Sequence, residues 1–149
     1  MRAVVQRVER CSVSVAEVTV GAIERGLCVL VGVDAGDTEA DADALADKVI
    51  GLRIFPDVEG KMNLDVREAG GAVLAVSQFT LLGDVRRGRR PSFSRAMAPE
   101  PAHQLFGAFC AGIERRGVAL STGRFREHML VRIDNDGPVT ILIDSKRAF

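Results

Sequence analysis

Three polar residues and one aromatic residue directly follow an all-apolar segment, at the point where a buried strand should end. They come after residues 72–76 and are Ser77, Gln78, Phe79 and Thr80. Polar side chains and unpaired backbone N–H groups at the rim of a sheet can bind a ligand, and a threonine hydroxyl can act as a nucleophile when a base activates it. The same pattern also fits a strand that simply ends in polar residues, so this segment alone leaves both interpretations open.

A second polar segment lies between two apolar runs near the C-terminus. The runs cover residues 129–133 and 139–143, and Asn-Asp-Gly-Pro at 135–138 separates them. This composition is typical of a turn, so we expect two neighbouring strands joined by a hairpin connection. A cis bond before Pro138 is the minority alternative, because only about 5–6% of X–Pro bonds in folded proteins are cis.

Four arginines stand close together within residues 82–101, the longest stretch without clear periodicity. They are Arg86, Arg87, Arg89 and Arg90. Such a cluster can contact RNA phosphates, although a solvated loop is its more common interpretation. Over the whole chain, 20 basic and 20 acidic side chains cancel. Since no net field attracts a polyanion, a polyanion site would have to be a local patch.

Familiar catalytic motifs are missing. The chain has no Gly-x-Ser-x-Gly elbow, no Gly-x-x-x-x-Gly-Lys phosphate loop and no His-Glu-x-x-His zinc helix. Its two histidines are His103, on an expected amphipathic helix, and His128, beside an expected strand, and we expect neither to be a catalytic base. Cys11, Cys28 and Cys110 lack metal-ligand spacing and are interpreted as reduced, mostly buried thiols. An enzyme built on this sequence is therefore expected to use no histidine base, metal or cofactor.

Length and apolar patterning predict a single α+β domain over residues 1–149. Alternating apolar residues predict strands within 2–20, and continuous apolar runs at 27–33 and 72–76 predict two buried strands. Because strands cluster at both ends of the chain with helices between them, we expect a mixed, largely antiparallel sheet with a barrel-like core.

Two main amphipathic helices are expected between these groups of strands. Thr38 can cap the first, and the second should begin at Pro99 or Pro101 and end near Gly117. The first ten residues lack the apolar core of a signal peptide, and no run of about 20 apolar residues could span a membrane. We therefore expect a cytoplasmic protein without a membrane partner.

Several segments in a fixed order resemble the D-aminoacyl-tRNA deacylase family, also called D-Tyr-tRNA(Tyr) deacylases. The matching segments run nearly from end to end and are 1–8, 61–64, 77–81, 88–93, 122–125 and 135–140. Two stretches depart from the family pattern. Leu-Gly at 82–83 stands where the family has an aromatic residue and Ala, and Arg-Glu-His-Met at 126–129 is a less familiar sequence, which the resemblance places near the nucleotide pocket.

The resemblance implies hydrolysis of the ester that joins a D-amino acid to the terminal adenosine of tRNA, a chiral proofreading step in translation. It also implies a homodimer with active sites at the subunit interface. One subunit supplies the pocket at 77–80, and the other inserts Gly137 and Pro138, joined by a cis bond. Arg7 resembles the residue that helps to hold this Gly-Pro pair. The remaining positions assigned to the substrate are Phe125 and Met129, and those assigned to tRNA are Arg86, Arg87, Arg89 and Arg90.

A deacylase for many D-amino acids has to read the α-carbon, because the side chains differ. Backbone groups of 77–80 and the carbonyls of Gly137 and Pro138 can surround the α-amino group and leave a D side chain pointing outward. An L side chain would then collide with this clamp. Glycine has no side chain to collide, so we expect some hydrolysis of glycyl-tRNA as well.

Two mechanisms remain open for the cleavage step. Thr80 is one nucleophile to consider, although no base stands near it in the sequence. We favour assistance by the 2′-hydroxyl of the terminal ribose, with backbone N–H groups near Phe79 and Thr80 stabilising the oxyanion. Two alternative functions are a non-catalytic RNA-binding module that stacks bases on Phe93 and a threonine esterase for small substrates.

Overall fold

Two helices lie between an N-terminal and a C-terminal group of strands, as the sequence pattern predicts. The computed structural model describes all 149 residues. The elements in chain order are β1 (Arg2–Val15), β2 (Val18–Ile23), β3 (Gly26–Gly32), α1 (Glu39–Ile50), β4 (Phe55–Pro56), β5 (Met62–Leu64), β6 (Ala72–Ser77), η1 (a 3-10 helix, Phe79–Leu82), α2 (Pro99–Arg115), β7 (Leu120–Thr122) and β8 (Leu130–Asp144).

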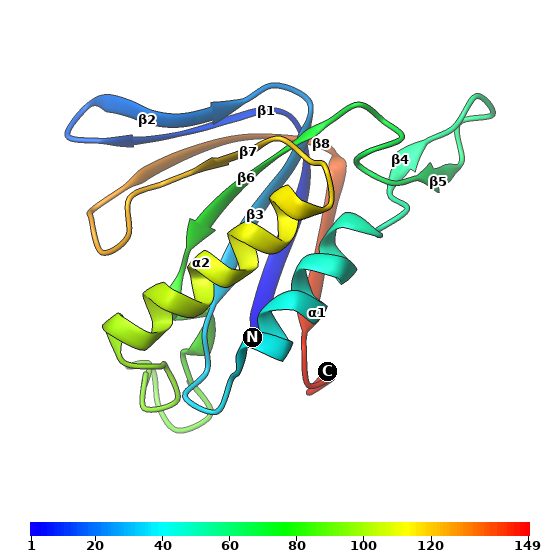
Figure 1. Cartoon of the computed structure of the whole chain (residues 1–149). Coiled ribbons are helices and arrows are strands. Elements are labelled where there is room, and N and C mark those ends of the chain that lie inside the picture. Colours follow the sequence, from blue (N-terminus) through cyan, green and yellow to red (C-terminus); the bar gives the residue numbers. More distant parts are fainter.

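The long strand β1 organises the main sheet (Figure 1). It pairs with β2 and β3 in succession along one edge and with β8 along the other, and all three pairings are antiparallel. β6 adds parallel to β3, and β7 adds parallel to β6. The expected mixed, largely antiparallel sheet is therefore confirmed, with the runs at 27–33 and 72–76 as its inner strands. A separate short hairpin, β4–β5, projects from the body of the protein (Figure 1).

The sheet curls until its first hairpin covers its last parallel strand. β2 approaches β7 so closely that a β-carbon on Gly21 would lie 2.4 Å from the Thr122 carbonyl oxygen, so only glycine fits there. The enclosed side is filled by seven buried residues: Val8, Cys11, Val13, Ile23, Cys28, Leu74 and Val76. This closure confirms the barrel-like core.

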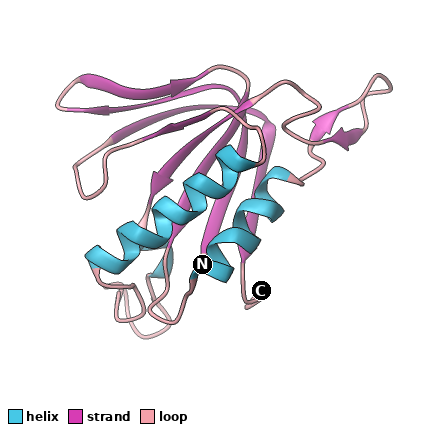
Figure 2. Ribbon diagram, in the orientation of Figure 1, coloured by secondary structure: helices cyan, strands magenta, loops and turns pink.

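Both helices pack on the other face of the sheet (Figure 2). Thr38 is the N-cap residue of α1 as predicted, and its backbone N–H donates to the Asp41 carboxylate at 2.9 Å, as in a capping box. A core of 25 buried residues, with Phe55 and Phe109 among the largest, fills the space between sheet and helices. Neither helix combines the length and the apolar character that a bilayer crossing requires.

The prediction of a hairpin at residues 135–138 is wrong. Residues 130–144 form one strand, and both of its halves pair with β1. Between the pairs Gln6–Thr140 and Val8–Asn135, β8 advances five residues while β1 advances two. The Gly-Pro pair is therefore bulged out of a continuous strand. Turn-forming residues suit such a bulge as well as a hairpin, and β1 is long enough to pair with both apolar runs.

Candidate functional site

A cavity of about 660 Å³ opens where β6 ends, between η1, the start of α2 and the segment that joins β7 to β8. Eleven of its 17 lining residues are hydrophobic, as in most small-molecule sites. The lining includes five of the residues predicted to form the catalytic and substrate-binding site: Ser77, Gln78, Phe79, Phe125 and Met129. Thr80 is not among the lining residues. The cavity thus brings together the polar end of β6 and residues 125–129, almost 50 positions further along the chain.

The end of β6 leaves backbone donors free beside the cavity. The Gln78 N–H still donates to the Val31 carbonyl (2.7 Å), which extends the parallel pairing by one residue. The chain then turns into η1, whose first internal hydrogen bond runs from the Leu81 N–H to the Gln78 carbonyl (3.3 Å). The N–H groups of Phe79 and Thr80 precede that bond and have no acceptor within the helix. Two adjacent free donors of this kind can stabilise an oxyanion.

The Thr80 hydroxyl lies on the exposed side of η1. Its hydrogen-bond partner is the side-chain amide of Gln78, which donates to it. An amide N–H group cannot accept a proton, so this contact does not activate the hydroxyl as a nucleophile. The geometry therefore gives Thr80 no general base.

The segment between β7 and β8 lines the cavity with the apolar side chains of Phe125 and Met129 and with three polar ones, Arg126, Glu127 and His128. Phe125 also stacks on the exposed His103 ring, with 4.5 Å between ring centroids. The start of α2 lies beside this segment, and because Pro99 and Pro101 have no N–H, the first helical turn offers only the N–H of Glu100 as a free donor. This helix start is therefore a poor anion site. The apolar part of the lining, around Phe125, therefore suits a flat, neutral group.

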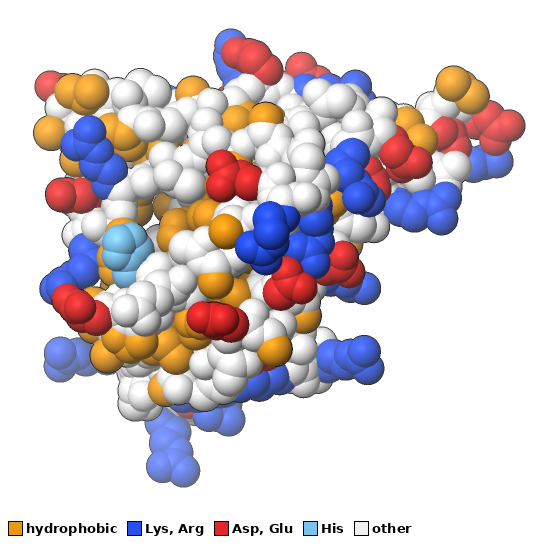
Figure 3. All heavy atoms as spheres, viewed as in Figure 1, with side chains coloured by type: hydrophobic (Ala, Val, Ile, Leu, Met, Phe, Trp, Pro, Cys, Tyr) orange, Lys and Arg blue, Asp and Glu red, His pale blue; other side chains and the backbone are white.

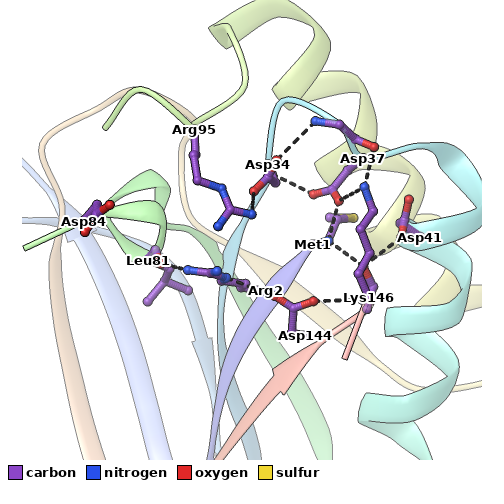
Figure 4. Close-up of polar contacts among 12 residues, drawn as sticks. Met1, Arg2, Asp34, Asp37, Asp41, Leu81, Asp84, Arg95, Asp144 and Lys146 are labelled. Atoms are coloured by element: carbon purple, nitrogen blue, oxygen red, sulfur yellow. Dashed lines mark hydrogen bonds and ion pairs between the residues drawn. The ribbon is translucent and has the colours of Figure 1, made fainter. Parts of the chain in front are cut away.

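Two contacts between distant segments hold the cavity walls in place (Figure 4). Arg95, on the wall segment before α2, forms an ion pair with Asp34 at 2.5 Å. Partial burial acts to raise the pKa of Asp34, but hydrogen bonds from the Gly36 N–H and from Arg95 lower it below its ordinary value. On the other side, Arg2 donates to the Leu81 carbonyl of η1 at 3.3 Å. Sequence reasoning missed these contacts because they join positions far apart in the chain.

The four arginines of the loop after η1 are all exposed, but they are not equivalent. Arg86 forms an ion pair with Asp84 at 2.5 Å, and this contact holds the pKa of the Asp84 carboxyl well below its usual range. Arg87, Arg89 and Arg90 have no carboxylate partner. Basic side chains project at the lower margin of the molecule in Figure 3, where Figure 1 places this loop. Three free cations therefore lie in the loop that follows η1.

Asn135 closes the bulge that carries the Gly-Pro pair. Its side-chain oxygen accepts from the Val139 N–H (2.8 Å), and its side-chain nitrogen donates to the Val139 carbonyl (3.3 Å). The Thr140 hydroxyl also accepts from the Asn135 amide, at 3.2 Å. The peptide bond between Gly137 and Pro138 is cis. Sequence reasoning gave Asn135 and Thr140 no role of their own, and the structure makes them the frame of the bulge.

Arg7 braces the bulge from β1. Its Nε donates to the Asp136 carbonyl (3.2 Å) and pairs with the Asp136 carboxylate (3.0 Å), while Nη1 donates to the Ile54 carbonyl (2.6 Å). Arg7 is only 9% exposed, so its guanidinium is held on several sides. A β-carbon on Gly137 would lie 3.2 Å from Nη2. Arg7 thus contacts Asp136, the residue before the Gly-Pro pair, and its role in holding the pair itself stays a prediction.

The Gly-Pro bulge is not part of the cavity of the same chain. Both of its residues are exposed, and neither lines the cavity. The bulge lies beside Arg7, which pairs with Leu27 of β3, whereas Ser77 pairs with Val31 at the other end of that strand. One chain therefore presents the cavity and the Gly-Pro pair at separate places on its surface.

The other candidate groups contribute less. His128 is exposed and lines the cavity, and it makes no hydrogen bond that would orient it as a base. Cys11 and Cys28 are buried in the barrel-like core, and Cys110 is partly buried. No three His, Cys, Asp or Glu side chains come close enough together to hold a metal ion.

Comparison with known proteins gives a consistent result. The family model described as D-Tyr-tRNA(Tyr) deacylase matches residues 4–144. Proteins named D-aminoacyl-tRNA deacylase from Symbiobacterium thermophilum and Thermotoga petrophila are 59% and 57% identical to the chain, and each match covers 100% of this chain and 99% or more of the relative.

Solved structures agree in fold. One titled c-Myc DNA Unwinding Element Binding Protein has a TM-score of 0.91 at 39% identity, covering 97% of this chain and 98% of that one. One described as a probable eukaryotic D-amino acid tRNA deacylase has a TM-score of 0.82 at 19% identity, covering 95% and 97%, and shows the fold alone. The extent of the family-model match and the identity to the relatives lead to one conclusion: the chain belongs to the D-Tyr-tRNA(Tyr) deacylase family.

Proposed function

We propose that the protein is an enzyme that hydrolyses the ester of D-aminoacyl-tRNA, releasing the D-amino acid and free tRNA. Family membership supports deacylase activity. The observation that carries the proposal is the largely apolar cavity at the end of β6, next to the two free backbone donors at the start of η1. A charged-tRNA substrate implies that the enzyme works in the cytoplasm, during translation quality control.

In this proposal the terminal adenosine of tRNA occupies the apolar part of the cavity, against Phe125 and Met129. The scissile ester then lies near Ser77 and the N–H groups of Phe79 and Thr80, which are placed to stabilise the developing negative charge. A neutral base fits an interior where the start of α2 offers few anion-binding donors. No cofactor or metal enters the scheme.

The chiral filter requires a second copy of the chain. Because the Gly-Pro bulge lies away from its own cavity, Gly137 and Pro138 have to reach the cavity of a partner in a homodimer. Their backbone then blocks the space that an L side chain would need, and a D side chain points away from it. Asn135 and Arg7 hold the bulge rigid, which a steric filter demands.

Paired substrates test the function directly. We expect D-aminoacyl-tRNA to be hydrolysed at least about a hundredfold faster than its L-enantiomer, because a steric clash is a strong discriminator. Glycyl-tRNA should also be cleaved, since it has no side chain to collide. The measurement is release of labelled amino acid from matched tRNAs. Cleavage of neither enantiomer would favour an RNA-binding module, and equal cleavage would favour an unselective esterase.

The arginine loop is expected to bind the acceptor phosphates through Arg87, Arg89 and Arg90. Neutralising any one of the three by glutamine should lower the slope of log binding constant against log salt by up to about one. The matched control is the double variant Asp84→Asn/Arg86→Gln, which removes one charge of each sign and should leave the slope nearly unchanged. An equal decrease of the salt-dependence slope in the control, or no decrease in the three single variants, would contradict this assignment.

A further inference from the structure

Arg126 stands at the edge of the cavity without a partner. It lies on the segment between β7 and β8, directly after the wall residue Phe125, and it is both exposed and part of the cavity lining. Arg86 and Arg95, which also lie near the cavity, are paired with Asp84 and Asp34. Arg126 forms no ion pair, so its guanidinium is free to bind an anion.

The backbone at Arg126 is unusual as well. Its φ is +66°, in the left-handed region that side chains other than Gly, Asn and Asp rarely adopt. The turn that contains it is closed by a bond from the Glu127 N–H to the Arg124 carbonyl (3.3 Å), which fixes Phe125 and Arg126 relative to each other.

We propose that Arg126 binds the 5′-phosphate of the terminal adenosine, and so makes the enzyme prefer a nucleotide ester over a nucleoside ester. The inference rests on the proposed function, in which the adenine lies against Phe125. Arg126 follows Phe125 directly and lines the same cavity, so its long, free side chain borders any nucleotide whose base lies against Phe125. The free guanidinium of Arg126 supplies the positive charge needed to bind a phosphate, which neither the apolar part of the cavity nor the start of α2 provides.

The neighbouring side chains define the controls. Arg124 is on the same turn and is exposed, but it does not line the cavity. Glu127 does line it and carries the opposite charge. Arg124→Gln therefore removes the same charge without removing the proposed contact, and Glu127→Gln removes a repulsive group. Arg126→Lys retains a cation at the site.

The test compares substrates and ligands with and without the phosphate. The substrates are the D-tyrosyl esters of adenosine and of 5′-AMP, and the ligands for calorimetry are adenosine and 5′-AMP themselves. We expect Arg126→Gln to lower kcat/KM for the AMP ester and the affinity for AMP about tenfold, and to leave the adenosine compounds within about twofold. Arg126→Lys should recover most of the preference, Arg124→Gln should retain it, and Glu127→Gln should raise or retain it.

The same preference for phosphate in Arg126→Gln as in the unmodified protein would overturn the proposal. An equal loss of the preference for phosphate in Arg124→Gln would also overturn the proposal, because the effect would then come from the overall positive charge of this surface and not from a contact with Arg126. The calorimetric arm separates this inference from the proposed function. Arg126-dependent binding of AMP without hydrolysis of either ester would support the phosphate site and contradict deacylation.

Discussion

Replacement of Gly137 by alanine is expected to lower kcat/KM for D-aminoacyl-tRNA by about a hundredfold or more. The added β-carbon would lie 2.7 Å from Val139 Cγ2, 3.1 Å from the Val139 nitrogen and 3.2 Å from Arg7 Nη2. Gly137 also has a φ of +131°, which an alanine rarely adopts. The bulge therefore has to shift, and a displacement of about 1 Å in a catalytic arrangement can cost about a hundredfold in rate.

Gly60 provides the matched control for this variant. It lies in the turn between β4 and β5 with a φ of +79°, and a β-carbon there would meet nothing within 4 Å. Gly60→Ala should lose about 1–2 kcal/mol of stability through the unfavourable backbone, and Gly137→Ala should lose at least as much, because its β-carbon also meets Val139 and Arg7. Only Gly137→Ala should lose activity, measured by single-turnover hydrolysis on folded protein. Full activity of Gly137→Ala would place Gly137 outside the reaction centre.

The same variant tests whether the bulge acts across a subunit interface. A suitable partner is Ala98→Trp, since Ala98 is an exposed lining residue and a large side chain there would block the cavity. Each variant alone should be inactive. In a co-refolded equimolar mixture, random pairing should restore about a quarter of the sites, because one subunit supplies an intact cavity and the other an intact bulge. No recovery in a mixture that forms dimers would exclude action in trans.

Most of the fold can be predicted from local pattern. Continuous apolar runs identify β3 and β6 as inner strands, because such strands are covered on both faces, by helices on one side and by the curled hairpin on the other. Thr38 with Asp41 predicts the start of α1, and Pro99 predicts the start of α2. In each case residues within a few positions of one another determine the outcome.

The continuity of β8 is not predictable in this way. Asn-Asp-Gly-Pro has the same local chemistry in a hairpin and in a bulge. Pairing with β1 over its full length decides between them, and that depends on residues more than 100 positions away. β7 has only three residues and is fixed by its pairing with β6, so its sequence gives little periodicity to detect.

In the candidate site, too, the features set by neighbouring residues can be predicted, and those set by distant contacts cannot. The position of 77–80 at the end of a buried strand is predictable, because the change from apolar to polar residues marks it. Met97 also lines the cavity, yet it lies in a stretch without periodicity, so nothing local points to it. Phe93 of the same stretch stands out only as a stacking residue of the alternative RNA-binding module, and its place in the cavity lining is not predictable. The difference between Arg86 and the other loop arginines depends on one ion pair with Asp84, which charge counting does not reveal.

The roles of Thr80 and of the substrate can be separated by removing each hydroxyl in turn. We expect a tRNA that ends in 2′-deoxyadenosine, charged through its 3′-ester, to be hydrolysed at least about a hundredfold more slowly, because it lacks the group that assists the attack. The Thr80→Val variant should hydrolyse the ordinary D-aminoacyl-tRNA at a rate within about tenfold of that of the unmodified enzyme, because the Thr80 hydroxyl has only an amide donor as its partner.

Single-turnover rates on matched D-aminoacyl substrates measure both effects, and binding of uncharged tRNA controls for lost affinity. The reverse pattern, in which the deoxy substrate is cleaved at the normal rate and Thr80→Val is inactive, would make Thr80 the nucleophile. Trapping of an acyl-enzyme on Thr80 would point the same way. The expected pattern would instead mean that the enzyme accelerates the reaction by positioning the substrate. A reaction assisted by the 2′-hydroxyl of the substrate needs only hydrogen-bond donors and a rigid site, and η1 offers two free N–H donors and no base.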